Sequence, residues 1–515
     1  MRVLIFQQRG WGIKFGHYFA TQIKKEYPGA VFAAMVFKKT TLDFIEKQKD
    51  IDYEQMVFFD DVQNSPEKYI ADNITLNQIC EELDIKTVWP LVQSLRNHVK
   101  DYSKKYYYSF RQQASDELIK KIIKATFVSI KELVDTFQPD IIISPNYVAL
   151  PHIMMSIYAK KNGVKMIAIT DTKVKGVNIW VSGYQENEGI FFDCFRAYEK
   201  NFNSIDMDVR LRAEKYLHSF RKHYIMPDYF EKKVSKSNVI KGIKNASDFK
   251  EAIKKNKTLK AIFLFLRGNK TPGIIDNVVT LDNRGRYFIA RDYFSELYYT
   301  SKLNKWNFDK VNNHEEYVYF PLQFQPEASL DVIAPLFNNQ IEVARQIAMA
   351  LPGDLILVVK EHPAMLGKRP PSYLEKIQKL PNVKFVDYRL KSYDLMKKAK
   401  AVVSINSTAC IEAAFLGTPV IQLGDLGTPL LLPHVKKCTD FSKLPYIITK
   451  HMSTDFRSEE YDKILIAYIA AAYKVGFETN YAGMWEHGET GDVLPIWEKL
   501  NCELKYLKSM EDNIL

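Results

Sequence analysis

The residues whose types could do chemistry lie between Leu355 and Asp425, where two apolar runs each end in a polar cluster. The first cluster is KEHP, in which Lys360 and His362 come directly before Pro363, a residue that stiffens the loop. A cation and a titratable imidazole at a strand end can balance negative charge that grows on a departing phosphate. A lone histidine is more often structural, and only its position at a strand end favours a function for His362.

The second cluster is Asn406-Ser407-Thr408, which follows the run AVVSI and opens a helical pattern. One such residue is an ordinary helix N-cap, but three exceed what a cap needs, and helix N-termini bind phosphate. Glu412 follows Thr408 by four residues and therefore shares its helix face. Its carboxylate could accept hydrogen bonds from ribose or sugar hydroxyls, and a solvated helix acid is the alternative.

The elements that must position these clusters alternate between strand and helix. From Tyr317 to Gly424 the patterns predict four successive strand–helix steps and a further strand, which indicates a parallel sheet. In such a sheet the carboxyl ends of the strands share one edge, so the two clusters should lie close together there. The runs VLIF, PDIIIS and VKMIAIT predict a second α/β unit in the N-terminal half, interrupted by a helical insertion over residues 65–137.

We therefore expect an N-terminal domain over residues 1–225, a basic connecting segment over 226–315 and a C-terminal domain with a helical tail over 316–515. A transfer reaction also needs a base that deprotonates an acceptor, and the N-terminal domain should supply it across the cleft. Asp171 directly follows the strand MIAIT and is the first candidate, with a turn cap as its alternative. His17 is the second candidate. Arg9 and Gly10 in the first glycine-bearing loop, and Asn146 at another strand end, are predicted to contact the acceptor.

Composition limits the setting of the protein. The chain has 515 residues and a net charge of +11, which favours anionic partners. Its five scattered cysteines fit a reducing cytoplasm, and no transmembrane run is expected. The stretch from Glu231 to Lys260 holds ten lysines against three acids. Such a run is usually a solvated helix face, but it can also lie on an anionic membrane, so we expect peripheral contact at the inner face of the cytoplasmic membrane as the alternative.

Three segments resemble the capsule polysaccharide biosynthesis proteins, a GT-B group that includes Kdo transferases. The segments are FPLQFQPEAS, KEHPA and SINSTACIEAAFLGTPVIQLGD. They are more distantly similar to bacterial sialyltransferases and polyol-phosphate polymerases, which use cytidine-activated donors. The resemblance covers about Tyr317 to Asp425 and implies two Rossmann-like domains around a cleft, with the donor bound mainly by the C-terminal domain.

The resemblance also implies roles for single residues. His362 and Pro363 match the family's His-Pro element, and Ser407 and Thr408 match its hydroxyl pair on the nucleotide phosphate. The helix acid and the polar loop near the cleft are matched by Glu412, Gln323, Gln325 and Glu327.

The expected function is therefore a glycosyltransferase with a nucleotide-sugar donor, preferably CMP-linked, and a glycan or lipid-linked glycan acceptor of capsule or lipopolysaccharide. Neither a cofactor nor a protein-bound metal is expected, because the two Asp-x-Asp spacings do not follow strands. Nucleic acid is not expected as a partner. Two alternatives stay open: a sugar-nucleotide epimerase or polyol-phosphate polymerase on the same fold, and a non-catalytic protein that binds an anionic polymer. Whether the reaction inverts or retains configuration also stays open.

Overall fold

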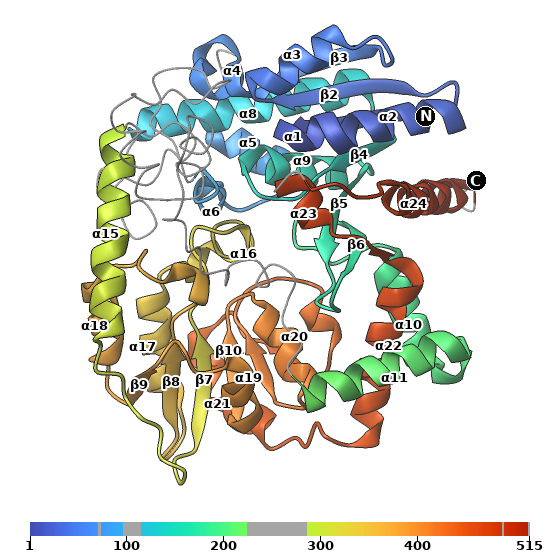
Figure 1. Cartoon of the computed structure of the whole chain (residues 1–515). Helices are drawn as coiled ribbons and strands as arrows, with labels where there is room; N and C mark the ends of the chain where they lie inside the picture. The colour runs from blue at the N-terminus through green and yellow to red at the C-terminus, as the bar shows by residue number, and fades with distance from the viewer. Residues whose placement is uncertain (71–73, 96–114, 224–285, 487–488, 513–515) are drawn as a thin grey trace, which may run out of the picture.

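The computed structural model describes residues 1–70, 74–95, 115–223, 286–486 and 489–512. Two β-sheets, one from each half of the chain, lie one above the other with helices around them (Figure 1). This arrangement confirms the predicted α/β class with two Rossmann-like units of the GT-B type.

The N-terminal sheet has the strand order β13-β6-β5-β4-β1-β2-β3. Strands β1 to β5 are parallel, β6 pairs antiparallel with β5, and β13 pairs antiparallel with β6 at the edge of the sheet. Along β1 the side chains alternate: Val3 and Ile5 enter one core, whereas Leu4 and Phe6 enter the core on the opposite face. The strands are Arg2–Gln8 (β1), Val31–Phe37 (β2), Tyr53–Phe58 (β3), Ile141–Ser144 (β4), Lys165–Asp171 (β5), Val177–Ser182 (β6) and Phe477–Glu478 (β13).

Helices cover both faces of this sheet because each carries an apolar stripe. The long helix α8 begins where the Ser115 side chain accepts a hydrogen bond from the Leu118 N–H, and it ends at Gln138 in a left-handed conformation. The predicted helical insertion includes α5, α6 and α8, while its residues 71–73 and 96–114 lie outside the described part. The helices of this half are α1 (Arg9–Trp11), α2 (His17–Glu26), α3 (Lys39–Lys47), α4 (Phe59–Asn64), α5 (Leu76–Glu82), α6 (Trp89–Val92), α8 (Asp116–Phe137), α9 (Leu150–Lys161), α10 (Ile190–Lys200) and α11 (Met207–Lys222).

The C-terminal sheet is parallel throughout, in the order β12-β11-β10-β7-β8-β9. The change of direction in strand order falls between β10 and β7, so ligand-binding loops are expected at the carboxyl ends of these strands. The strands are Tyr317–Pro321 (β7), Ile356–Lys360 (β8), Val383–Val386 (β9), Ala401–Ser404 (β10), Val420–Gln422 (β11) and Val435–Lys437 (β12). The helices are α15 (Arg286–Asn304), α16 (Ala328–Asp331), α17 (Gln340–Ala350), α18 (Pro371–Gln378), α19 (Ser392–Lys398), α20 (Thr408–Phe415) and α21 (Leu444–Met452).

The end of the chain returns to the N-terminal sheet. Helix α22 (Glu459–Val475) shares one core with α10 and α11, and β13 then pairs with β6. Two more helices, α23 (Tyr481–Glu486) and α24 (Leu494–Asp512), add side chains to the core beneath β1. The sequence predicted a helical tail but gave no sign of this crossover. The predicted domain limits stay predictions, since residues 224–285 lie outside the described part.

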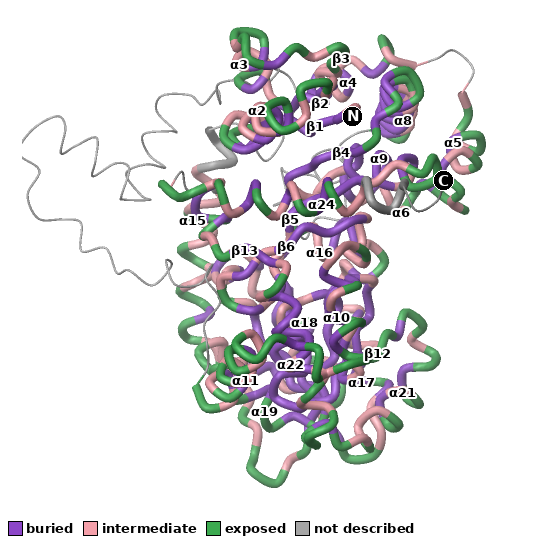
Figure 2. Tube along the Cα trace, turned by 90° about the vertical axis from the view of Figure 1, so that its right-hand side faces the viewer, coloured by how far each residue is buried: buried purple, intermediate pink, exposed green. Residues whose placement is uncertain are grey.

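One continuous core joins the two halves of the molecule. It contains Val177 and Ile179 of β6 together with Ile411 and Phe415 of α20. Figure 2 shows buried residues concentrated in the strands and in the α10–α22 region, with exposed residues on the outer helices. None of the helices in the described ranges is long and apolar enough to span a membrane. The lysine-rich stretch of residues 231–260 lies outside those ranges.

Candidate active site between the two sheets

A cavity of about 100 Å³ lies where the carboxyl end of β5 approaches the start of α20. Strands β5 and β6 of the N-terminal sheet, helix α20 and the end of the chain contribute to its wall. The lining residues are Asp171, Lys173, Lys175, Gly176, Val177, Asn178, Tyr216, Phe220, Thr408, Glu412, Thr479, Asn480, Tyr481 and Ala482. The structure therefore brings together three residues that the sequence singled out, namely Asp171, Thr408 and Glu412.

Helix α20 begins directly after β10. The Ser407 side chain caps it by accepting a hydrogen bond of 3.2 Å from the Ala409 N–H, and its Oγ lies 2.8 Å from Oγ of Ser404. The cap leaves Thr408 as the first helical residue, on the wall of the cavity. Its hydroxyl also bonds the Glu412 carboxyl one turn along, as the spacing predicted.

Glu412 is only 8% exposed, although it belongs to the cavity wall. Burial raises its pKa from the ordinary 4.5 to about 7, because the charged carboxylate loses hydration. Nearby charges act in both directions: Lys173 and Lys360 lower the pKa of Glu412, and Asp171 raises it. A carboxyl group that titrates near neutral pH inside a cleft is a frequent feature of active sites.

Asp171 is the last residue of β5 and faces the cavity with a half-exposed side chain. Its Oδ1 accepts a hydrogen bond of 2.7 Å from the Lys173 backbone N–H, and its Oδ2 lies 3.1 Å from Lys173 Nζ. Lys173 has a φ of 66°, a left-handed conformation that is unusual for a lysine and costs about 1–2 kcal/mol. The turn fixes the carboxylate and places a cation beside it.

The polar cluster at the end of β8 is held by bonds within the protein. Lys360 Nζ donates to the Leu390 carbonyl at 2.9 Å, and burial lowers the pKa of Lys360 to about 8. Glu361 is 1% exposed and forms a salt bridge with Arg369, which is equally buried. Arg369 also donates to the Gln323 carbonyl at 2.7 Å.

His362 and Pro363 start a short 3-10 turn after β8. The Nδ1 atom of His362 accepts a hydrogen bond of 3.1 Å from the Ala364 N–H, which places the ring proton of the neutral imidazole on Nε2. The ring lies 6.1 Å from that of Phe324. Neither His362 nor Pro363 belongs to the cavity wall, so their roles stay predictions.

The glutamines predicted at the donor are buried within the C-terminal domain. The Gln323 side chain donates to Ser404 Oγ at 3.2 Å, and Gln340 donates to the Gln325 side chain at 3.3 Å. Glu327 behaves differently, because it is exposed and its charge raises the pKa of Lys173. Of the three loop residues, only Glu327 therefore acts on a group of the cavity.

Asn406 also uses its amide inside the protein. Its Nδ2 donates to the Ser329 carbonyl at 3.0 Å, and its Oδ1 accepts from the Leu426 N–H at 3.2 Å. The side chain thus ties the segment after β10 to helix α16 and to the loop that follows β11. A donor contact by Asn406 stays a prediction.

The segment predicted as a glycine-bearing loop is helical instead: α1 begins at Arg9 directly after β1, and Gly12–Gly16 form a π-helical turn that continues into α2. It is not part of the cavity wall. Arg9 and Gly10 are exposed, whereas Gly16 packs against β1 so closely that a Cβ atom would lie 2.2 Å from Gln7 Oε1. This glycine therefore serves helix packing. Asn146, at the end of β4, has a buried Oδ1 with no hydrogen-bond partner among the described residues.

His17, the second candidate base, lies on α2 with its Nε2 at 3.2 Å from Asp50. It is not part of the cavity wall, unlike Asp171. Of the two base candidates, the structure therefore places only Asp171 beside Thr408 and Glu412.

Several residues of the cavity wall were missed by the sequence analysis. Lys173 and Lys175 follow Asp171 directly and could have been found as the continuation of that loop. Tyr216 lies in an ordinary charged helix, and Thr479 and Asn480 lie about 300 residues further along than Asp171. Nothing in the sequence links these segments, since only the crossover brings them together.

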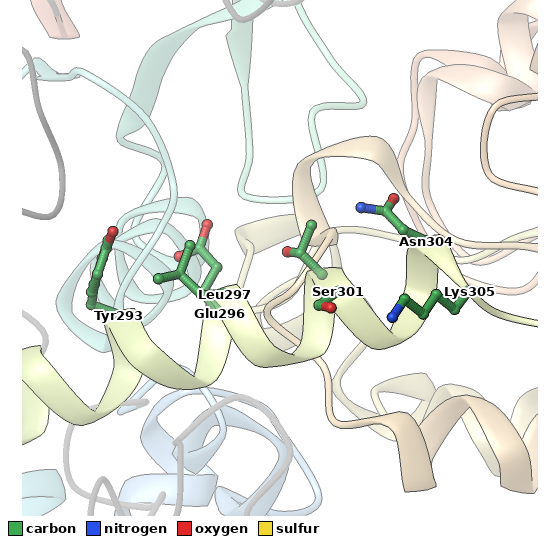
Figure 3. Close-up of a pocket in the computed structure, with 7 residues that line it drawn as sticks. Tyr293, Glu296, Leu297, Ser301, Asn304 and Lys305 are labelled. Atoms are coloured by element: carbon green, nitrogen blue, oxygen red, sulfur yellow. The ribbon is translucent and has the colours of Figure 1, made fainter. Parts of the chain in front are cut away.

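A second cavity, of about 460 Å³, lies along α15 (Figure 3). The described residues that line it belong to α15, except Lys305, which directly follows that helix, so the described chain gives the cavity a single wall. Across the described residues we also find no cluster of three or more histidine, cysteine or acidic side chains able to hold a metal ion.

Residues 287–426 match the family model described as "Capsule polysaccharide biosynthesis protein". The predicted family resemblance is confirmed over these residues. The matched segment contains both polar clusters and runs from α15 to the end of β11, so the family's sequence signature covers the C-terminal sheet and not the Asp171 side of the cavity.

One curated relative is Protein FixF of Sinorhizobium fredii, which is 32% identical over 133 residues. The alignment covers 24% of this chain and 31% of FixF, so the chain spans about a third of that relative. Two solved structures are similar, the β-Kdo 2,7 and β-Kdo 2,4 transferase units of Thermosulfurimonas dismutans KpsC. They are 12% and 15% identical with TM-scores of 0.32 and 0.34, and cover 67% and 70% of this chain and 79% and 87% of their own.

Proposed function

We propose that this protein is a glycosyltransferase that moves a sugar from a nucleotide donor to a growing surface polysaccharide. The observation that carries the proposal is the meeting of Asp171, from the N-terminal sheet, with Thr408 and Glu412, from helix α20 of the C-terminal domain, around a single cavity. A carboxylate on one side and a helix N-terminus on the other suit an acceptor hydroxyl and a donor phosphate. The family match of the C-terminal segment supports the same function.

On the donor side, the N-terminus of α20 and the Thr408 hydroxyl would bind the phosphate, and Glu412 would bind donor hydroxyls. Ser407 is bonded to Ala409 and Ser404, so its hydroxyl contributes to this site mainly by fixing the start of the helix. Positive charge for the departing nucleotide would come from the helix dipole and from Lys360 without a bound metal, since Lys360 lies near enough to Glu412 to lower its pKa. We favour a CMP-linked acidic sugar such as Kdo, on the resemblance.

On the acceptor side, Asp171 would take the proton of the attacking hydroxyl. A bond then forms between the acceptor oxygen and the anomeric carbon of the donor sugar, the bond from that carbon to the phosphate oxygen breaks, and the nucleotide leaves with the electron pair. Lys173 holds the Asp171 carboxylate from two sides, through its N–H and its ammonium group. This orientation lets the carboxylate act without reorganisation.

The experiment that tests this proposal begins with thermal-shift titrations against CMP, CDP, UDP and GDP. A specific nucleotide should raise Tm by mass action, and we expect CMP to do so. The CMP-sugar is then incubated with acidic glycan acceptors, and nucleotide release is measured. Asp171→Asn should release CMP about 10²–10⁴-fold more slowly and bind CMP with unchanged affinity.

Asp208→Asn, at an exposed position near the start of α11, is the matched control and should behave as wild type. The proposal fails if no nucleotide shifts Tm, or if Asp171→Asn releases CMP at the wild-type rate. Epimerisation of the sugar without nucleotide release would instead support the epimerase alternative. We further propose that the enzyme works at the inner face of the cytoplasmic membrane, which co-sedimentation with anionic vesicles would test.

A further inference from the structure

Besides the residues of β5, β6, α11 and α20, the cavity is lined by residues from the end of the chain. Thr479, Asn480, Tyr481 and Ala482 follow β13 and line the cavity; we name them the crossover loop. Lys175 and Asn178, which follow Asp171 in the sequence, also line the cavity. These residues play no part in the donor contacts proposed above.

The crossover loop is firmly held. Before it, β13 pairs with β6 through Phe477 and Asn178, and Arg212 donates two hydrogen bonds of 2.7 and 2.6 Å to the Glu478 carboxylate. Within the loop, the Tyr481 hydroxyl accepts a buried hydrogen bond of 2.7 Å from the Trp11 indole N–H. A loop fixed at both ends can position a ligand without being ordered by it.

The Asn480 side chain helps to hold the crossover loop in place and is not the side chain that we assign to a ligand. Its Nδ2 donates to the Glu489 carboxylate at 2.7 Å, and its Oδ1 accepts from the Gly483 N–H at 3.1 Å. Both ends of the amide are therefore used to shape the turn that follows the loop.

Thr479 is different, because its hydroxyl oxygen is buried and has no hydrogen-bond partner among the described residues. A buried polar atom without a partner costs about 1–3 kcal/mol, and most such atoms in folded proteins are satisfied. Thr479 belongs to the cavity wall, so a ligand in the cavity could supply the missing partner. Tyr216 and Tyr481 on the same wall provide aromatic surface for the apolar face of a sugar.

We propose that the crossover loop forms the acceptor subsite and binds the terminal sugar of the glycan, with Thr479 bonding one of its hydroxyls. This inference rests on the proposed function, since it places the acceptor in the part of the cavity that the proposed donor contacts do not use. Lys175, an exposed cation on the same wall, would face an anionic group of the acceptor. The end of the chain therefore determines acceptor specificity, although it lies outside the segment that matches the family.

The test is Thr479→Val, which removes the hydroxyl at nearly constant volume. With a methyl glycoside of Kdo as the first acceptor probe, we expect KM for the acceptor to rise about tenfold, the worth of one good hydrogen bond. The Kd for CMP and the slow hydrolysis of the donor in the absence of acceptor should stay within twofold of wild type. Tm should not fall, because the free protein loses no hydrogen bond.

Thr449→Val is the matched control, because its exposed hydroxyl bonds only the preceding turn of α21. The inference is overturned if the wild-type enzyme transfers sugar and Thr479→Val leaves the acceptor KM unchanged, or if the variant weakens CMP binding instead. If wild type releases nucleotide from none of the donors with acidic or neutral acceptor probes, the proposed function fails first and the subsite fails with it. The two failures are thus distinguishable.

Discussion

The ends of β8 and β10 are chemically alike in the sequence but differ in the structure. At β8 the buried Glu361 and Arg369 form a salt bridge, and Arg369 also donates to the Gln323 carbonyl, although Glu361 Oε2 has no hydrogen-bond partner among the described residues. At β10 the side chains of Thr408 and Glu412 contribute to a cavity. The first strand end is a buried polar network that fixes the loops, whereas the second contributes side chains to a cavity wall, where we propose that they contact a ligand.

Because of this difference, substitutions at the two strand ends should have different consequences, one for stability and the other for function. Where buried charged groups pair with each other, as Glu361 and Arg369 do, substitution should unfold the protein before it alters chemistry. Where a buried group belongs to a cavity wall, substitution can change ligand binding at little structural cost. The predictions below test whether the two strand ends divide in this way.

The largest effect is expected for Arg369→Met. The substitution leaves the Glu361 carboxylate buried without its cation, which should lower the free energy of unfolding by about 3–5 kcal/mol. Urea unfolding measures this loss. Arg389→Met, which breaks the exposed pair with Asp387, is the control and should leave the unfolding midpoint unchanged. If Arg369→Met were as stable as wild type, the end of β8 would not be a structural network.

A smaller effect, dependent on pH, is expected for Glu412→Gln. Because burial raises the pKa of Glu412 to about 7, the folded state takes up a proton that the unfolded state releases near pH 4.5. The stability that this proton provides is complete below about pH 4.5 and is lost as the pH rises through 7. Glu412→Gln should remove up to about 3 kcal/mol of pH dependence in this window.

Urea unfolding of wild type and Glu412→Gln at pH 5, 6, 7 and 8 measures the difference. Glu503, whose pKa burial raises to about 8 in α24, gives a matched comparison away from the cavity. Glu503→Gln should also reduce the pH dependence of stability, but only Glu412→Gln should weaken CMP binding. Equal CMP affinity in both variants would contradict the donor role of Glu412.

The sequence predicted correctly those features that depend on residues close together in the chain. Alternating apolar runs and helical patterns predicted both α/β units, and strand-end positions selected Asp171, Thr408 and Glu412, which the structure brings together. The capping role of Ser407 was visible as the alternative to phosphate binding, and the structure shows it.

What the sequence could not provide was the pairing of distant groups. Nothing in KEHP shows that Arg369 neutralises Glu361, or that Gln323 bonds Ser404. The return of residues 477–482 to the first sheet depends on β13, a strand of two residues that is too short to have a pattern. These features come from tertiary packing, which local propensity does not encode.

A smaller effect is expected for Thr408→Val, at the residue of α20 that lines the cavity after β10. Removing the hydroxyl should raise the Kd for CMP about tenfold, as expected for one hydrogen bond to phosphate, with little loss of stability. Ser407→Ala provides the contrast, since it removes the helix cap and should cost about 1 kcal/mol in the free energy of unfolding. Isothermal titration with CMP and urea unfolding separate the two effects. If only Ser407→Ala altered CMP affinity, the phosphate contact would belong to the cap residue and not to Thr408.

A loss of stability as small as that of Ser407→Ala is expected at His362, which follows β8. Its Nδ1 accepts the Ala364 N–H, so His362→Ala should lose this cap and about 1 kcal/mol of stability. His362→Asn places an amide oxygen near the same point and should keep most of that stability, but it removes the imidazole. If His362 balances charge on the leaving phosphate, nucleotide release should fall in both variants, by about 10-fold or more. If release follows stability instead, so that His362→Asn is as active as wild type, then His362 belongs with Glu361 and Arg369 to the structural network, and the whole end of β8 serves the fold.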